Sequence, residues 1–219
     1  MQKKFLIIIG FLSLLGCKQN IPNASKVEEK PVLASNQPID SILRKELEQI
    51  AVEDQTLRLI LPDAGRKFGD GSSEEKYIWS LIHRQDSICL NKTLKIIDKY
   101  GWLGKSRVGN TANQALWLVI QHAELAKQEK YLPMLKESVE MGESEGWNQA
   151  FLEDRILMRK KKNQIYGTQA AWDKTTGKMK IYPIDDVENV NRRREQIGLE
   201  PIEEYAKMNG YIFDHKDNK

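Results

Sequence analysis

Residues 39–61, IDSILRKELEQIAVEDQTLRLIL, decide the fold class of this chain. Apolar side chains recur there at steps of mostly three and four residues, which is the period of an amphipathic helix. The stripe consists of Leu43, Leu47, Ile50, Leu57 and Leu61. We therefore expect a long helix over this stretch, ended by a loop that begins at Pro62.

The helical period continues through most of the chain beyond this segment. The expected helices cover residues 73–99, 111–128, 131–141, 146–158 and 187–196, and a short turn covers 201–205. Gly101 suits a left-handed C-cap. The basic run Arg159–Lys162 falls at the end of one helix, where cations complement the helix dipole.

The period changes once, near the C-terminus. Two β-prone runs, Gln164–Gln169 and Met179–Tyr182, flank the glycine-containing segment Asp173–Lys178. Such a pattern predicts a β-hairpin. We therefore predict a mainly α fold: a single domain of five to six packed helices with one C-terminal β-hairpin over residues 39–213, followed by a tail at 214–219.

The N-terminus has the pattern of a lipoprotein signal. Lys3 and Lys4 precede an apolar run from Phe5 to Leu15, which is too short for a membrane-spanning helix. The run closes on Leu14-Leu15-Gly16-Cys17, the arrangement of a lipobox. We predict a signal peptide at 1–16 and acyl chains on Cys17, which anchor a protein without spanning the membrane.

A polar, proline-containing stretch follows the cysteine and predicts a flexible tether over residues 17–38. Lys18 is not the aspartate that favours inner-membrane retention, so we expect a cell-envelope protein, with the outer membrane favoured. The membrane, reached through Cys17, is then the first expected partner.

Composition excludes several function classes. The net charge is +3, and removal of Lys3 and Lys4 with the signal leaves about +1, so we expect no nucleic-acid partner. Cys89 would be the only cysteine besides Cys17, which excludes an intramolecular disulfide in the lipidated form. The sequence has no phosphate-binding loop, dinucleotide fingerprint or HExxH motif. We predict no cofactor.

Titratable side chains interrupt the apolar stripes of the four main helices. Asp54, Asp86, His122 and Asp154 each stand where an apolar residue would fit. Buried charges need partners, and the candidates are Arg58, Arg155 and Gln121. Two interpretations stay open: each group is satisfied locally, or all four converge on one site. The three aspartates with His122 are also the one set that suggests a metal ion, but we predict none.

Polar residues also occur on both sides of the first predicted strand. Gln164, Tyr166 and Thr168 alternate with Ile165, Gly167 and Gln169. This predicts either a strand that lines a ligand groove or an edge hairpin that faces water, with Gly167 at a bulge or a close backbone approach.

The order of these polar residues resembles an uncharacterised bacterial family of secreted proteins and lipoproteins, catalogued as a domain of unknown function. The resemblance covers roughly residues 43–205 and is most specific at Asp154-Arg155 and the Tyr-Gly-Thr-Gln stretch. Its other elements are Asp54-Gln55 with Arg58, Gly101-Trp102, Gln121-His122-Ala123, and Arg194 with Gly198-Leu199 and Tyr205. Leu103 and Glu124 depart from the pattern. The resemblance implies a shared fold and a shared site, but it assigns no particular activity.

Two functional hypotheses follow. The first is a membrane-tethered binding protein for an envelope glycan, peptide or protein, with ligand-binding candidates Arg58, Asp86, Gln121, Gln164, Tyr166, Thr168 and Gln169. The second is a hydrolase in which His122 acts as general base, oriented by Asp54 or Asp154, while Arg155 stabilises an anion.

Overall fold

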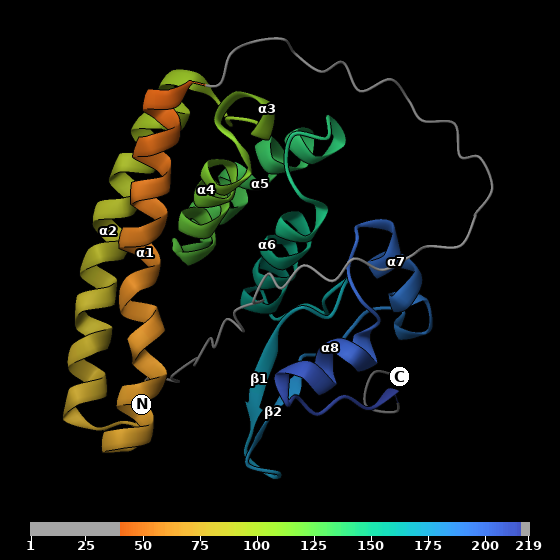
Figure 1. The fold of residues 1–219 in the computed structure, drawn as a ribbon. Helices are drawn as coiled ribbons and strands as arrows, with labels where there is room; N and C mark the ends of the chain where they lie inside the picture. The colour runs from red at the N-terminus through yellow and green to blue at the C-terminus, as the bar shows by residue number, and fades with distance from the viewer. Residues whose placement is uncertain (1–39, 216–219) are drawn as a thin grey trace, which may run out of the picture.

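The computed structural model describes residues 40–215. The predicted signal peptide, Cys17 and the tether lie outside the described residues, as do the last four residues of the tail. Figure 1 shows a long hairpin of α1 (Ser41–Phe68) and α2 (Ser73–Tyr100) on one side of the molecule, with the C-terminal elements on the other side.

Side-chain caps begin both long helices. Asp40 accepts a hydrogen bond from the Leu43 amide at 3.0 Å, and Ser72 accepts one from the Glu75 amide at 3.2 Å. The sequence interpretation placed a loop at Pro62, and that boundary is wrong because α1 continues to Phe68. Proline removes one helical hydrogen bond, but the helix beyond it still buries Ala64.

The middle of the chain contains three helices: α3 (Lys105–Val108), α4 (Asn110–His122) and α5 (Leu125–Glu140). The predicted single helix over 111–128 breaks at Ala123. Side chains from other helices satisfy the carbonyls at this break: Gln128 donates to Gln121 O at 2.6 Å and Arg159 to Ala123 O at 2.7 Å. These donors replace the helical hydrogen bonds that would have continued α4.

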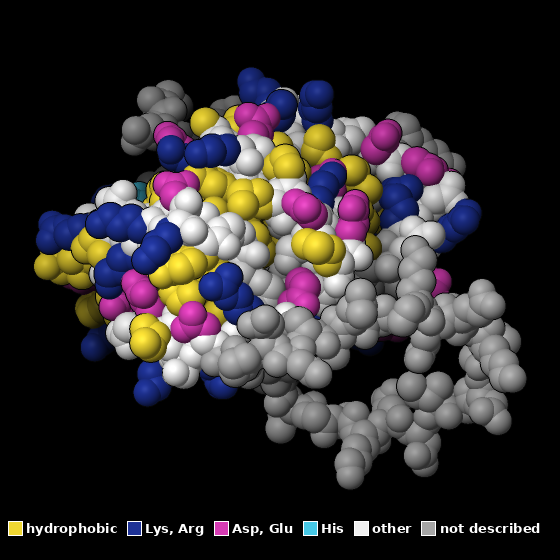
Figure 2. Space-filling model, turned by 90° about the horizontal axis from the view of Figure 1, so that it is seen from above, with side chains coloured by type: hydrophobic (Ala, Val, Ile, Leu, Met, Phe, Trp, Pro, Cys, Tyr) yellow, Lys and Arg dark blue, Asp and Glu magenta, His cyan; other side chains and the backbone are white. Residues whose placement is uncertain are grey.

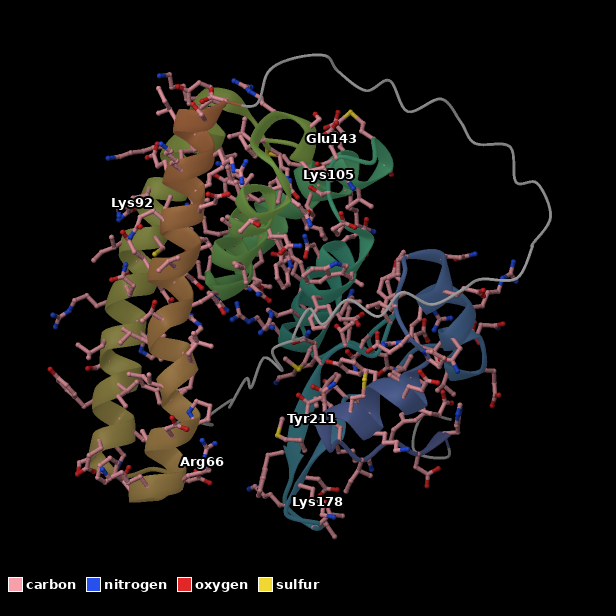
Figure 3. The ribbon with its side chains drawn as sticks, in the orientation of Figure 1. Arg66, Lys92, Lys105, Glu143, Lys178 and Tyr211 are labelled. Carbon is pink, nitrogen blue, oxygen red and sulfur yellow. The ribbon has the colours of Figure 1, made fainter. Side chains whose placement is uncertain are left out.

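The single turn of α3 has no periodicity of its own and was not predicted. It is held by the loop between α5 and α6, where the Lys105 amide donates to Glu143 O at 2.9 Å. Figure 3 shows these two labelled residues close together at one end of the molecule. The position of α3 therefore depends on a contact between residues far apart in the sequence.

The helix α6 (Gly146–Arg159) agrees with its predicted range and leads into the C-terminal part. That part contains the strands β1 (Ala170–Asp173) and β2 (Lys178–Ile181), the 3-10 turn η1 (Val187–Asn189), and the helices α7 (Val190–Gln196) and α8 (Ile202–Asn209). The strands form an antiparallel hairpin in which Ala170 pairs with Ile181 and Asp173 with Lys178.

The hairpin is confirmed, but its predicted first strand is wrong. Residues 164–169 form a loop, and β1 begins only at Ala170. The amides of Ile165, Tyr166 and Thr168 all donate to the carboxylate of Asp154. These amides are therefore not available for pairing in a sheet, and Gly167 between them has a φ of +72°.

Two clusters of buried apolar side chains form the core. The larger joins α1, α2, α4, α5 and α6, and the smaller joins β2, η1, α7 and α8. Phe151 on α6 packs against both clusters, with its ring 6.2 Å from that of Trp117 and 6.3 Å from that of Tyr205. The predicted fold class, a mainly α single domain with one hairpin, is confirmed. The described residues form eight α-helices instead of five or six, because α3 and α8 add to the six predicted.

The surface carries charges of both signs. On the face drawn in Figure 2, basic, acidic and hydrophobic side chains are interspersed. Cys89 is fully buried as a free thiol. Within residues 40–215, every helix is too short or too polar to cross a bilayer.

Candidate functional site

The interruption of the α1 stripe at Asp54 marks the centre of the candidate site. The Asp54 carboxylate is 1 % exposed and lies against the ring of His122, the last residue of α4. His122 Nδ1 lies 3.1 Å from both carboxylate oxygens. The side-chain amide of Gln55 donates from Nε2 to Asp54 Oδ2 at 2.6 Å. The carboxylate therefore fixes the orientation of the imidazole ring.

Arg58, which lies on α1 one turn after Asp54, connects this pair to a third helix, α2. Arg58 Nη1 donates to the Asp54 carbonyl oxygen at 2.7 Å and lies 3.7 Å from Asp54 Oδ2. Its Nη2 donates to Asp86 Oδ1 on α2 at 2.7 Å. Arg58 and Asp86 are partly exposed, whereas Asp54 is enclosed. The structure thus brings together three of the four predicted groups, from α1, α2 and α4.

The electrostatics of the pair favour a neutral histidine. Burial lowers the pKa of His122, and the positive charges of Arg58 and Arg155 add to this effect, while Asp54 opposes it. Burial raises the pKa of Asp54, but His122 and Arg58 outweigh burial and bring that pKa below its usual value. A neutral ring that donates from Nδ1 keeps its lone pair on Nε2.

His122 Nε2 is buried and has no hydrogen-bond partner among residues 40–215. The His122 side chain is only 8 % exposed. A fixed tautomer with a free second nitrogen is what a general base, a hydrogen-bond acceptor or a metal ligand requires. The side chains that enclose the ring include Asp54 on one edge, so the ring is not surrounded by alanine and leucine alone.

The shifted pKa of His122 predicts a loss of stability in mild acid. The unfolded chain binds the His122 proton more tightly than the folded chain does. The contribution of the neutral His122 to the free energy of unfolding is therefore fully present above its ordinary pKa of 6.5, and it is lost as the pH drops toward the folded-state pKa. We expect the free energy of unfolding to decrease by about 1 kcal/mol between pH 7.5 and pH 5.0 in urea titrations. Asp54 contributes to this pH dependence only in stronger acid. Its pKa is lowered in the folded state, so the stability that it adds is lost only as the pH falls below its ordinary value of 3.8.

His122→Gln should remove most of this pH response, since glutamine does not titrate. His83→Gln is the matched control, because His83 is exposed on α2 and should leave the response intact. An unchanged pH response in His122→Gln would contradict the prediction.

Asp54, Asp86 and His122 offer ligand atoms within 4.8 Å of one another and could hold a metal ion. The four-residue set considered from the sequence is wrong, because Asp154 lies in a different network. The Arg58 guanidinium already contacts both carboxylates. A metal ion would have to displace this positive charge, so the arrangement favours Arg58 as the resident cation.

Arg155 and Gln121 lie between α4 and α6. Arg155 is 1 % exposed, and its Nη2 donates to Gln121 Oε1 at 3.3 Å. Burial, reinforced by the charge of Arg159, lowers the pKa of Arg155 to about 10. Arg155 Nε and Nη1 and Gln121 Nε2 have no partner within the described part of the chain.

Asp154 is adjacent to Arg155 in sequence, but it bonds to the 164–169 loop and not to α4. Its carboxylate is fully buried and accepts hydrogen bonds from the amides of Ile165 at 2.8 Å, Tyr166 at 3.1 Å and Thr168 at 2.9 Å. The Thr168 hydroxyl adds a fourth bond at 2.9 Å. Burial raises the pKa of Asp154, and these four donors oppose the rise. Asp154 thus anchors the 164–169 loop and does not reach the Asp54–His122 pair.

The predicted ligand-binding residues of this loop are engaged with the loop itself. Gln164 Nε2 donates to Gln169 O at 2.9 Å and to Tyr182 O at 2.6 Å, and Gln164 Oε1 accepts from the Gln169 amide at 2.8 Å. Gln169 Nε2 donates to the Thr168 hydroxyl at 3.1 Å. Tyr166 is half-buried, and burial raises its pKa. A ligand-binding role for these residues stays a prediction.

Two arginines that we did not select as site residues complete these networks. Arg194 is fully buried and donates to Tyr166 O at 2.6 Å and Glu200 O at 2.6 Å. Its position four residues after the buried Val190 interrupts an apolar stripe, which is the signal that could have identified it. Arg159 belongs to the basic run at the end of α6, yet it also binds the carbonyl of Ala123 just after α4.

Comparison with known proteins gives one relationship. Neither the curated proteins nor the solved structures contain a match to this chain. Residues 41–216 match a family described as a family of unknown function, DUF6624. This range includes every described helix and both strands of the fold. The chain therefore belongs to the DUF6624 family.

Proposed function

We propose that this protein is a cell-envelope lipoprotein, anchored through Cys17, whose domain binds a small polar ligand at the Asp54–His122 pair. The proposal rests above all on His122 Nε2, a buried nitrogen without a partner in the described structure. Arg58 and Asp86, which are partly exposed, form the side of this cluster that solvent reaches. An envelope glycan or peptide supplies the hydroxyl and amide groups that such a nitrogen would bind.

A hydrolase is the second candidate, and the Asp54–His122 contact favours it. A carboxylate that accepts from Nδ1 leaves Nε2 to take a proton from water or a hydroxyl group, which is the relation of a general base to its orienting acid. Asp54 takes the orienting role in this candidate, because Asp154 bonds to the loop instead.

One experiment tests both candidates. Peptidoglycan fragments released by lysozyme carry sugar and peptide chemistry, and calorimetry would measure their binding to the full-length protein in detergent. We expect binding by the wild type and at least a tenfold weaker affinity for His122→Gln, with His83→Gln as the control. Equal affinity in the wild type and His122→Gln, or no binding by the wild type, would overturn the proposal.

The same mixtures, examined by mass spectrometry after incubation, separate binding from catalysis. New cleavage products that His122→Gln forms at least a hundredfold more slowly would identify a hydrolase. Unchanged fragments would identify a binding protein.

The proposed anchor makes a separate prediction. In a Gram-negative bacterial host fed an alkyne fatty acid, the wild-type protein should become labelled and sediment with membranes. Cys17→Ser should not become labelled, because acylation requires the thiol. No labelled protein should then sediment with membranes. Cys89→Ser is the matched control, since that thiol is buried in the core. Label retained in Cys17→Ser would refute lipidation at this residue.

A further inference from the structure

Arg155 is a buried cation with too few partners. Of its three nitrogens, only Nη2 has an acceptor among residues 40–215, the side-chain oxygen of Gln121 at 3.3 Å. Arg194 offers a comparison, because it is equally buried but donates to two carbonyl oxygens at 2.6 Å and lies over the ring of Tyr205. Arg194 Nη2 also forms no hydrogen bond, but it lies 3.9 Å from the Glu200 carboxylate. Arg155 differs because it has no carboxylate partner among the described residues and only one hydrogen-bond acceptor.

No carboxylate within the described residues forms an ion pair with Arg155. Asp154 directs both oxygens to the 164–169 loop, although it is adjacent in sequence. Asp54 and Asp86 are already paired with His122 and Arg58. A buried positive charge without a counter-charge is unfavourable by several kcal/mol.

The groups around Arg155 are mostly donors. Gln121 Nε2 has no acceptor in the part of the chain that the structure describes, and Arg159 adds a second positive charge. The two carbonyl oxygens at the end of α4 accept hydrogen bonds from other side chains, Gln121 O from Gln128 and Ala123 O from Arg159. What the cluster lacks is negative charge.

We infer that Arg155 and Gln121 bind an oxyanion, a carboxylate or phosphate group of the ligand, beside His122. The inference rests on the proposed function and names the chemical class of its ligand. A guanidinium matches the planar oxygens of a carboxylate or phosphate, and a free amide N–H adds a further donor. A metal cation would be repelled by the two arginines, and a neutral ligand would leave the charge uncompensated.

Thermal unfolding of the full-length protein in detergent tests the inference with two probes, sodium phosphate and sodium acetate. Sodium chloride at matched ionic strength is the reference. We expect at least one oxyanion to raise the Tm of the wild type by about 5 °C at a hundredfold excess over its Kd. Phosphate alone indicates a phosphate group in the ligand, and acetate alone indicates a carboxylate.

Arg155→Met should abolish this rise while keeping a Tm in chloride at or above that of the wild type, since an apolar side chain replaces an uncompensated charge. Arg194→Met is the control. It should lower the Tm in every salt, because it removes a partnered arginine, and should keep the oxyanion-dependent rise. A rise that persists in Arg155→Met, or no rise with either oxyanion, overturns the inference.

His122→Gln separates this inference from the proposed function. It should retain the oxyanion-dependent rise in Tm while binding peptidoglycan fragments at least tenfold more weakly. Fragment binding that depends on His122 without any oxyanion effect would overturn the inference alone. An oxyanion effect that requires Arg155, without any fragment binding, would support the inference and overturn the proposed function.

Discussion

Gly167→Ala is expected to lower the free energy of unfolding by about 3–5 kcal/mol. The added Cβ would lie 2.6 Å from Ile184 Cδ1 and 2.7 Å from Ile202 Cδ1, and both isoleucines are buried. The backbone at Gly167 has a φ of +72°, which strains any residue with a Cβ. The substitution therefore combines backbone strain with overpacking of the smaller core cluster.

Urea unfolding, followed by circular dichroism, measures this loss, and Gly177→Ala separates its two causes. Gly177 has a φ of +65° in the turn between β1 and β2, but beyond its chain neighbours no described atom lies within 4 Å of the place where a Cβ would stand. Its substitution should cost only about 1 kcal/mol, the strain part of the effect. Equal costs at the two glycines would show that Ile184 and Ile202 move aside freely.

Asp154→Ala is expected to cost about 4 kcal/mol, because it leaves three loop amides and one hydroxyl without their acceptor. Asp154→Asn keeps one acceptor oxygen but places an N–H group among donors, so we expect an intermediate cost of about 2–3 kcal/mol. The loss should appear as a lower urea midpoint together with faster amide exchange at Ile165 and Thr168.

Thr168→Val is the matched control for Asp154. It removes the hydroxyl bond to the carboxylate and the bond that Gln169 Nε2 donates to the hydroxyl, and it leaves the three amide bonds in place, so it should cost about 1–2 kcal/mol. If Asp154→Ala costs no more than Thr168→Val, the carboxylate does not hold the loop.

The sequence predicted those features that depend on neighbouring residues along a helix. The stripes of α1 and α2 are local patterns, and the polar interruptions at Asp54, Asp86 and His122 correctly marked three groups that meet. A break in such a stripe is informative because a buried carboxylate needs a partner, and the nearest buried partner usually interrupts another stripe.

The features that the sequence did not predict depend on distant partners. The end of α4 at Ala123 is set by Gln128 and Arg159, which satisfy its last carbonyls. The residues from Gln164 to Gln169 have high β propensity, yet their amides bond to a carboxylate more than ten residues earlier. Propensity cannot anticipate an acceptor supplied by another helix.

The same carboxylate explains the most specific motif of the family resemblance. Asp154 of α6 holds the loop that contains Gly167 and Thr168, whereas Arg155 donates to Gln121. The motif therefore combines residues that build the loop with one residue that faces the candidate site, and the sequence alone does not separate the two roles.

The adjacency of Asp154 and Arg155 also fixes how α6 can turn about its own axis. Consecutive helical residues point about 100° apart, and here one is bonded to the C-terminal loop and the other to α4. A rotation of α6 that improved either contact would pull the other away. The helix is thus held from two sides, and a single dipeptide determines its angular setting.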